Sequence, residues 1–224
     1  LSAFKVGENL ALTPGAVVYC NPLLEVIHYE ATTPTVHKTP LVIVSPWINK
    51  FYVLDLNPQK SLVKYLTDQG FSVFITSWKN PDESMRDISF DDYLLEGVVK
   101  IIDVAREISG ADKVNLAAYC IGGTLVATYL AWANRKDPDH VPVESATLFT
   151  TLTDFARPGD IEVFVDEGSI RYITQNMEKK GYLDGAEMAS AFRLLRSNSL
   201  IWHYVVHGWL YGETPRSEEH TSEL

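Results

Sequence analysis

The chain has 224 residues, of which 46% are hydrophobic and 21% are charged, as in a globular protein that can bury a sizeable core. Its formal net charge of −10 excludes a protein that follows a nucleic-acid backbone, because such a protein needs a basic surface. No run approaches the roughly 18 apolar residues of a membrane span, and no signal-peptide pattern opens the chain. We therefore expect neither a nucleic-acid partner nor a transmembrane segment.

Both ends of the sequence are unusual. It opens on Leu1 rather than Met, so we expect a fragment whose natural start is missing. Residues 216–224 are polar and follow Pro215 abruptly. They are similar to the translation of a common sequencing-adapter oligonucleotide, so we interpret them as an artefact tail and exclude them from the fold.

The first part of the chain, 1–40, is predicted to be a strand-rich amino-terminal segment. It holds the apolar runs 16–19 and 23–29, which are separated by prolines. Cys20 ends the first run, and we expect it to be a small buried hydrophobic residue. Cys20 and Cys120 are too few for a disulfide framework, and two free thiols favour a reducing, cytoplasmic compartment.

Strands and helices alternate over 41–150. We expect Asn57 to cap one helix and Gly70 to end it, and Ser89 to begin a capping box. The predicted elements are strand 41–44, helix 58–69, strand 71–77, helix 89–110, strand 114–118, a helix just after residue 120, and strand 143–149. Six residues of helix 89–110 have core spacing, namely Leu94, Val98, Ile101, Ile102, Ala105 and Ile108. This order predicts the first part of an α/β core, with a mostly parallel sheet covered by helices on both faces.

The strand signal fades after residue 150. Residues 184–187 are typical of a helix start, for a helix reaching about Arg196, and 200–211 is rich in aromatic residues. We interpret 151–215 as a partial helical cap insertion over the active edge of the sheet.

The most informative motif is AYCIGG at 118–123. It lies where a predicted strand turns into a helix, which is typical of a nucleophile elbow with Cys120 as the nucleophile. Residues two before and two after the nucleophile must be small, and Ala118 and Gly122 are small, with Gly123 following. The helix amino terminus favours a thiolate and oxyanion charge, and the N–H of Ile121 is a predicted oxyanion-hole donor. The alternative is a structural cysteine in a tight turn.

A second oxyanion donor is expected from the loop after strand 41–44, which has the sequence SPWINK at 45–50. Adjacent strands of a parallel sheet bring such a loop beside the elbow. We predict the N–H of Trp47 as the donor, with Ile48 as the neighbouring candidate. Without Cys120 nearby, this would be an ordinary proline-containing loop.

At this point the sequence resembles the class I polyhydroxyalkanoate synthases over essentially all of 1–215. The matching segments are 6–18 (VGENLALTPGAVV), 45–56 (SPWINKFYVLDL), 77–85 (SWKNPDESM), 118–125 (AYCIGGTL), 150–155 (TTLTDF), 164–168 (FVDEG) and 197–215 (SNSLIWHYVVHGWLYGETP). The resemblance implies an incomplete α/β-hydrolase fold. It also implies an acyltransferase that polymerises 3-hydroxyacyl-coenzyme A on an acylated Cys120. No cofactor is implied, and the implied partners are the acyl-CoA, the growing polyester, a second subunit in a homodimer and the cytoplasmic polymer granule.

The sequence departs from the family pattern at three points. Ala118 stands where the family usually has Gly, and His203 replaces an Asn. The family's catalytic Asp and His lie beyond Pro215, so neither role transfers to any residue in this sequence.

The residues also support acyl transfer without the family name, because a cysteine that attacks a thioester forms a new thioester and preserves the activation of the acyl group. Two alternatives stay open: a Cys-dependent α/β-hydrolase that cleaves esters or lactones, and a non-catalytic interaction module. His203 and His207 have metal-ligand spacing but lack the accompanying glutamate, so we predict no metal site. Asp55 is predicted to be either near the active-site loop or at a helix start, and Asp154 to form a turn.

Overall fold

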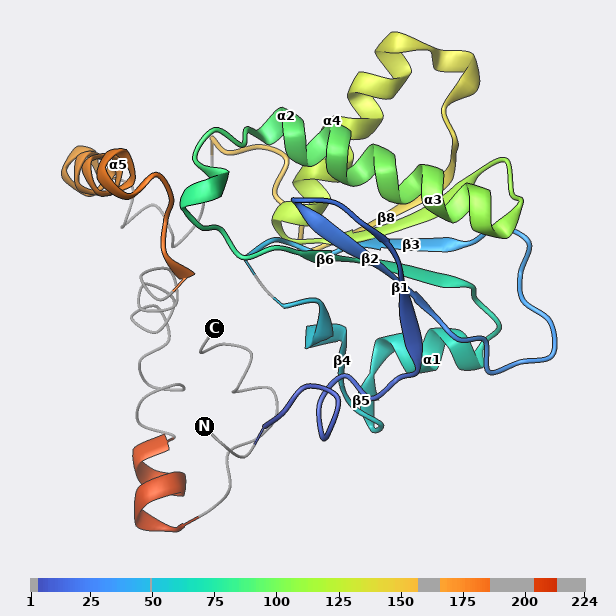
Figure 1. The fold of residues 1–224 in the computed structure, drawn as a ribbon, viewed down its shortest axis with the longest axis horizontal. Helices are drawn as coiled ribbons and strands as arrows, with labels where there is room; N and C mark the ends of the chain where they lie inside the picture. Colours follow the sequence, from blue (N-terminus) through green and yellow to red (C-terminus); the bar gives the residue numbers. More distant parts are fainter. Residues whose placement is uncertain (1–3, 49, 157–165, 186–203, 213–224) are drawn as a thin grey trace.

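The computed structural model describes residues 4–48, 50–156, 166–185 and 204–212. Within these residues, the centre of the fold is a six-stranded sheet (Figure 1). Its strands are β1 (Gly15–Cys20), β2 (Leu24–Tyr29), β3 (Leu41–Val44), β6 (Val73–Trp78), β7 (Val114–Tyr119) and β8 (Val143–Phe149). The spatial order is β1-β2-β6-β3-β7-β8.

The sheet is antiparallel at one end and parallel in the rest. β1 pairs with β2 and β2 with β6 in antiparallel fashion, whereas β6, β3, β7 and β8 run parallel to one another. The four parallel strands therefore end at one edge, where ligands of open α/β sheets bind. The predicted strands and the mostly parallel α/β architecture are confirmed.

Helices cover both faces of the sheet, as predicted (Figure 1). One face carries α1 (Leu62–Asp68), and the other carries α2 (Phe90–Asp92), a π-helical stretch (Tyr93–Val99), α3 (Lys100–Ser109) and α4 (Ile121–Lys136). Each face has its own buried cluster. The larger cluster joins β2, β3, β6 and β7 to the π-helical stretch, α3 and α4, and the smaller one joins the opposite face to α1. Apolar burial on both faces makes β3 the rigid centre of the fold.

The long predicted helix forms with one modification. Ser89 and Asp92 make the predicted capping box, and Gly110 ends the helix with a left-handed φ of 66°. Five of the six predicted core positions are buried, but Ile108 is exposed, so that prediction was wrong. Ile108 lies in the last turn of α3, where residues 107–110 are all exposed.

The predicted start of helix 58–69 was wrong. Residues of that region first form a short hairpin, β4 (Asp55–Asn57) and β5 (Lys60–Ser61). The Asn57 side chain accepts hydrogen bonds from the backbone N–H groups of Gln59 and Lys60 and so makes the hairpin turn. Ser61 caps α1 instead, because its Oγ accepts the N–H of Lys64 at 2.8 Å.

Cys20 is a further correction. It is exposed rather than buried, because β1 is an edge strand that ends at Cys20 and whose register shifts between Val17 and Tyr19. A bulge in an edge strand changes which side chains face the sheet.

Beyond β8, the structure describes the helix α5 (Glu167–Lys180), which the sequence analysis did not delimit, and a π-helical turn over Tyr204–Leu210. Asp166 caps α5, and Arg86 donates a hydrogen bond to the carbonyl of Glu178 near its end. The predicted helix from Asp184 to Arg196 lies mostly outside the described residues. In the described ranges, no helix combines the length and hydropathy needed to cross a bilayer.

Candidate active site

Cys120 is the single residue between β7 and α4, so the chain changes from strand to helix at this position. Its backbone has φ 53° and ψ −133°, a region that residues with a side chain rarely adopt and that costs roughly 1–3 kcal/mol. Cys120 is exposed and is not in a disulfide. The strained turn therefore presents the thiol at the carboxyl edge of the parallel strands and at the first turn of a 16-residue helix.

Small residues around Cys120 allow this turn to form. Ala118 is fully buried and pairs with Val44 of β3. A Cβ atom on Gly122 would lie 2.5 Å from the carbonyl oxygen of Val44 and 3.1 Å from the nitrogen of Pro46. Larger side chains at these positions would push apart β7, α4 and the loop after β3.

The segment directly after β8 also contacts the elbow. The N–H of Cys120 donates to the carbonyl of Phe149 at 3.2 Å, and Thr124 Oγ1 donates to the carbonyl of Leu152 at 2.7 Å. A Cβ atom on Gly123 would collide with the side chain of Thr151. Sequence analysis recognised 150–155 as a matching segment but did not foresee that it supports the start of α4.

The loop after β3 is the second part of the site. Ser45 is fully buried and makes three hydrogen bonds with Thr76 of β6. Its N–H donates to Thr76 Oγ1 at 2.9 Å, its Oγ donates to the Thr76 carbonyl at 2.6 Å, and the two hydroxyl oxygens lie 2.9 Å apart. The peptide bond between Ser45 and Pro46 passes over Gly122. This contact brings the predicted donor loop beside the first turn of α4.

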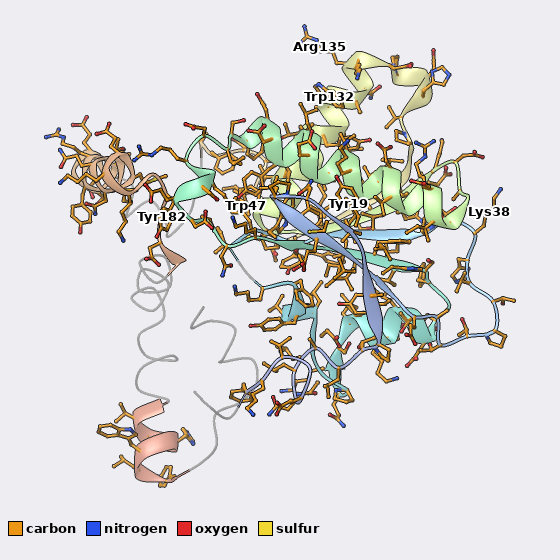
Figure 2. The ribbon with its side chains drawn as sticks, viewed as in Figure 1. Tyr19, Lys38, Trp47, Trp132, Arg135 and Tyr182 are labelled. Carbon is orange, nitrogen blue, oxygen red and sulfur yellow. The ribbon has the colours of Figure 1, made fainter. Side chains whose placement is uncertain are left out.

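Aromatic side chains surround the Trp47 ring. The ring centroids of Tyr93, Phe90 and Trp78 lie 4.6, 6.2 and 6.3 Å from that of Trp47. Figure 2 shows Trp47 between the sheet and the helical layer above it. The sequence pattern identified Trp47 through its backbone alone and did not indicate this cluster.

The N–H of Ile121, the other predicted donor, belongs to the first residue of α4. N–H groups in the first turn of a helix have no acceptor within the helix, and the helix dipole adds positive potential there. Ile121 and Trp47 thus lie on the two backbone segments that Gly122 brings into contact. The amino terminus of α4 favours negative charge beside Cys120, and the role of the Trp47 N–H as a second donor stays a prediction.

Tyr119, which precedes the cysteine, was not singled out from the sequence. Its hydroxyl is buried and has no hydrogen-bond partner among the described residues. Burial, together with negative charge at Cys120, raises the pKa of the Tyr119 hydroxyl far above its ordinary value. The Tyr119 hydroxyl therefore keeps its proton and stays neutral.

The remaining candidates lie away from the elbow or outside the described residues. Asp55 is buried and bonds to Thr13 and Ser61, so it lies beside the α1 start. Asp154 accepts the N–H of Ala156 in a turn. His203 falls outside the described residues. Within the described residues, no three His, Cys, Asp or Glu side chains lie close enough together to hold a metal ion.

Comparison with known families agrees with this architecture. Residues 40–179 match the model of the α/β-hydrolase fold, and the chain belongs to that family. Residues 1–66 match the model of the poly-beta-hydroxybutyrate polymerase amino terminus. The predicted resemblance to polyhydroxyalkanoate synthases is thereby confirmed.

Three curated relatives are described as a poly(3-hydroxyalkanoate) polymerase or as a subunit of one. A poly(3-hydroxyalkanoate) polymerase of Methylorubrum extorquens is 50% identical over 96% of this chain and 35% of its own length. Relatives of that name from Rhizobium meliloti and Cupriavidus necator are 48% and 45% identical over 96% of this chain, and over 35% and 37% of their own lengths. The chain therefore spans about a third of the length of these relatives.

Proposed function

We propose that this chain carries the nucleophile-bearing part of an acyltransferase that polymerises 3-hydroxyacyl-CoA into polyhydroxyalkanoate. Cys120 is the nucleophile, and the N–H groups of Trp47 and Ile121 form the oxyanion hole. The observation that carries the proposal is the strained Cys120 backbone between β7 and α4, in a chain half identical to a named polymerase.

The reaction has two steps in this proposal. The Cys120 thiolate attacks the thioester carbonyl, the carbonyl electron pair moves onto oxygen, and the two N–H groups stabilise that oxyanion. The oxyanion collapses, coenzyme A leaves as a thiolate, and an acyl-Cys120 thioester remains. The 3-hydroxyl of another acyl unit then loses its proton, attacks this thioester and forms an oxygen ester, which frees the Cys120 thiolate.

Acid–base chemistry needs further groups. The family resemblance assigns those roles to an Asp and a His that correspond to no position in 1–215. Tyr119 is unsuited to act as the base, because its raised pKa keeps the proton on the hydroxyl. The reaction as written needs no metal or organic cofactor, since acyl-CoA supplies both the acyl group and the driving force.

A hybrid enzyme tests the proposal. Residues 1–215 of this chain replace the matched segment of the Methylorubrum extorquens polymerase, and the unmodified polymerase serves as the control. Coenzyme A release from 3-hydroxybutyryl-CoA is followed with a thiol reagent, and the product is separated into polymer and free acid. We expect the hybrid to form polymer and to release one coenzyme A for each 3-hydroxybutyryl unit that it incorporates.

The alternatives give different products. A Cys-dependent hydrolase would release free 3-hydroxybutyrate without polymer, and an interaction module would release no coenzyme A although the hybrid folds. Either result, with the control active, would overturn the proposal.

The proposed setting is the cytoplasm at the surface of the polymer granule, with a homodimer as the assembly. A fluorescent hybrid expressed in polymer-accumulating cells should collect on granules. A diffuse signal in such cells would contradict this part of the proposal.

A further inference from the structure

Trp78, the last residue of β6, reaches across to the loop that carries the proposed oxyanion donor. Its Nε1–H donates to the carbonyl oxygen of Ser45 at 2.6 Å. That carbonyl belongs to the peptide bond between Ser45 and Pro46, one peptide bond before the one that presents the Trp47 N–H. Trp78 therefore holds the backbone directly beside the donor.

Only a short backbone path separates the held carbonyl from the donor. The peptide plane of Ser45–Pro46 is joined to the plane carrying the Trp47 N–H through φ and ψ of Pro46. The proline ring fixes φ near about −65°. Once Trp78 fixes the first plane, a single torsion sets the direction of the Trp47 N–H.

The other groups around Ser45 further restrict the orientation of the Ser45–Pro46 peptide plane. Thr76 bonds to both the N–H and the Oγ of Ser45, and Gly122 contacts the backbone from the elbow side. None of these bonds involves the Ser45 carbonyl oxygen, which accepts its hydrogen bond from the Trp78 indole.

Gly97 makes the space for this indole. A Cβ atom on Gly97 would lie 2.8 Å from Cζ3 of Trp78 and closer still to the ring carbon beyond it. Gly97 lies within the π-helical stretch Tyr93–Val99, although glycine is a poor residue for a helix interior. The Trp78 ring also packs against Tyr93, four residues earlier in the same stretch, with the ring centroids 5.1 Å apart. A glycine and an aromatic ring of one helical stretch thus confine the indole.

We infer that Trp78 is a positioning residue of the oxyanion hole, which aims the Trp47 N–H through the Ser45 carbonyl. This inference rests on the proposed function, because the oxyanion hole belongs to that reaction. Trp78 itself does not touch the substrate in this scheme. Its loss should therefore weaken binding of the tetrahedral state much more than binding of the ground state.

The test uses Trp78→Phe in the hybrid enzyme, which keeps an aromatic ring and removes the indole N–H. We expect the single-turnover rate of coenzyme A release to fall about tenfold, less than the ~10²–10³ that follows loss of a donor itself. Affinity for a trifluoromethyl ketone analogue of the acyl-CoA, which the thiolate converts to a tetrahedral oxyanion, should fall about as much, because both depend on the same donor. Affinity for a thioether analogue without a carbonyl should stay within about twofold.

Trp132→Phe is the matched control. Trp132 is exposed and lies twelve residues beyond Cys120 along α4, or about 18 Å at the helical rise. Figure 2 shows it on the part of α4 that extends away from Trp47. The control should leave all three measurements unchanged.

Gly97→Ala is a second, independent variant, because it displaces the indole without removing any polar group. It should lower the acylation rate and the ketone affinity together, as Trp78→Phe does. If these variants lose ketone and thioether affinity equally, the role of Trp78 is merely structural and the inference is overturned. Unchanged ketone affinity would also overturn it, because the oxyanion hole would then not depend on Trp78. If Trp78→Phe does not fold, the inference is judged on the ketone and thioether affinities of Gly97→Ala.

The inference and the proposed function can fail separately. If the parent hybrid is active but the variants give one of these contrary results, only the inference about Trp78 fails. If the parent hybrid is inactive, the proposed function itself is refuted.

Discussion

Gly122 and Val44 are in direct backbone contact, since a Cβ atom on Gly122 would lie 2.5 Å from the Val44 carbonyl oxygen. Val44 ends β3, and Gly122 lies in the first turn of α4. The contact therefore joins the strand that leads into the proposed donor loop to the helix that follows Cys120. Any atom inserted between them would move both parts of the site at once.

Gly122→Ala in the hybrid enzyme tests this contact. The obstructing atoms are backbone, so the added methyl group cannot be accommodated by a side-chain rotation, and overpacking of this kind costs about 1–3 kcal/mol. We expect a lower thermal midpoint and at least a hundredfold slower coenzyme A release, on the scale of losing about one oxyanion donor. Gly208→Ala is the control, because a Cβ atom there meets nothing within 4 Å. Normal activity and stability of Gly122→Ala would mean that the contact is not required.

The thiol itself is tested by Cys120→Ala. This change should abolish coenzyme A release and polymer formation. The thermal midpoint should stay close to that of the parent, because alanine has a Cβ atom as cysteine does and so has similar backbone preferences. Cys120→Ser should be far slower than the parent, because a hydroxyl is much harder to deprotonate than a thiol. Cys20→Ala, at the other exposed free cysteine, should change nothing. Polymer made by Cys120→Ala would remove the cysteine from the mechanism.

Asp55 provides a test of stability away from the reacting groups. Asp55 is 2% exposed, and its carboxylate accepts hydrogen bonds from Thr13 Oγ1 at 2.6 Å and Ser61 Oγ at 2.7 Å. Asp55→Ala removes the buried acceptor of these half-buried donors and should lower the free energy of unfolding by about 2–4 kcal/mol. Asp68→Ala, at an exposed ion pair with Lys64, should have no measurable effect. Chemical denaturation of both variants measures the difference, and equal stability would refute this assignment.

Much of the fold follows from local sequence. The apolar run at 41–44 forms a strand with the predicted bounds, because a parallel strand that is buried on both faces needs continuous apolar residues. Strand 143–149 also has the predicted bounds, although most of its residues are exposed. The turn at 118–123 could also be predicted from the sequence, because a sharp turn from strand to helix requires small residues on both sides of Cys120. The roles of Cys120, Ile121 and Trp47 in catalysis stay predictions.

Features that depend on tertiary contacts could not be predicted from the sequence. Asn57 and Ser61 are both good helix caps, and only the β4–β5 hairpin decides that Ser61 has that role. The exposure of Cys20 depends on β1 being an edge strand. Similarly, the Trp78–Ser45 bond joins residues 33 positions apart, and no periodic pattern encodes such a pairing.

The last prediction concerns the strain at Cys120 itself. With φ 53° and ψ −133°, a residue with a Cβ atom costs about 1–3 kcal/mol there, whereas glycine adopts positive φ freely but loses about 0.5–1 kcal/mol more on folding. Cys120→Gly should therefore be more stable than Cys120→Ala by about 1 kcal/mol. The same comparison at Ala131, an exposed residue within α4, should have the opposite sign, with Ala131→Gly less stable than the parent by about 1 kcal/mol. Thermal and urea unfolding of the three variants measures both differences. A Cys120→Gly variant less stable than Cys120→Ala would show that the backbone at the elbow is relaxed and that the turn does not store strain.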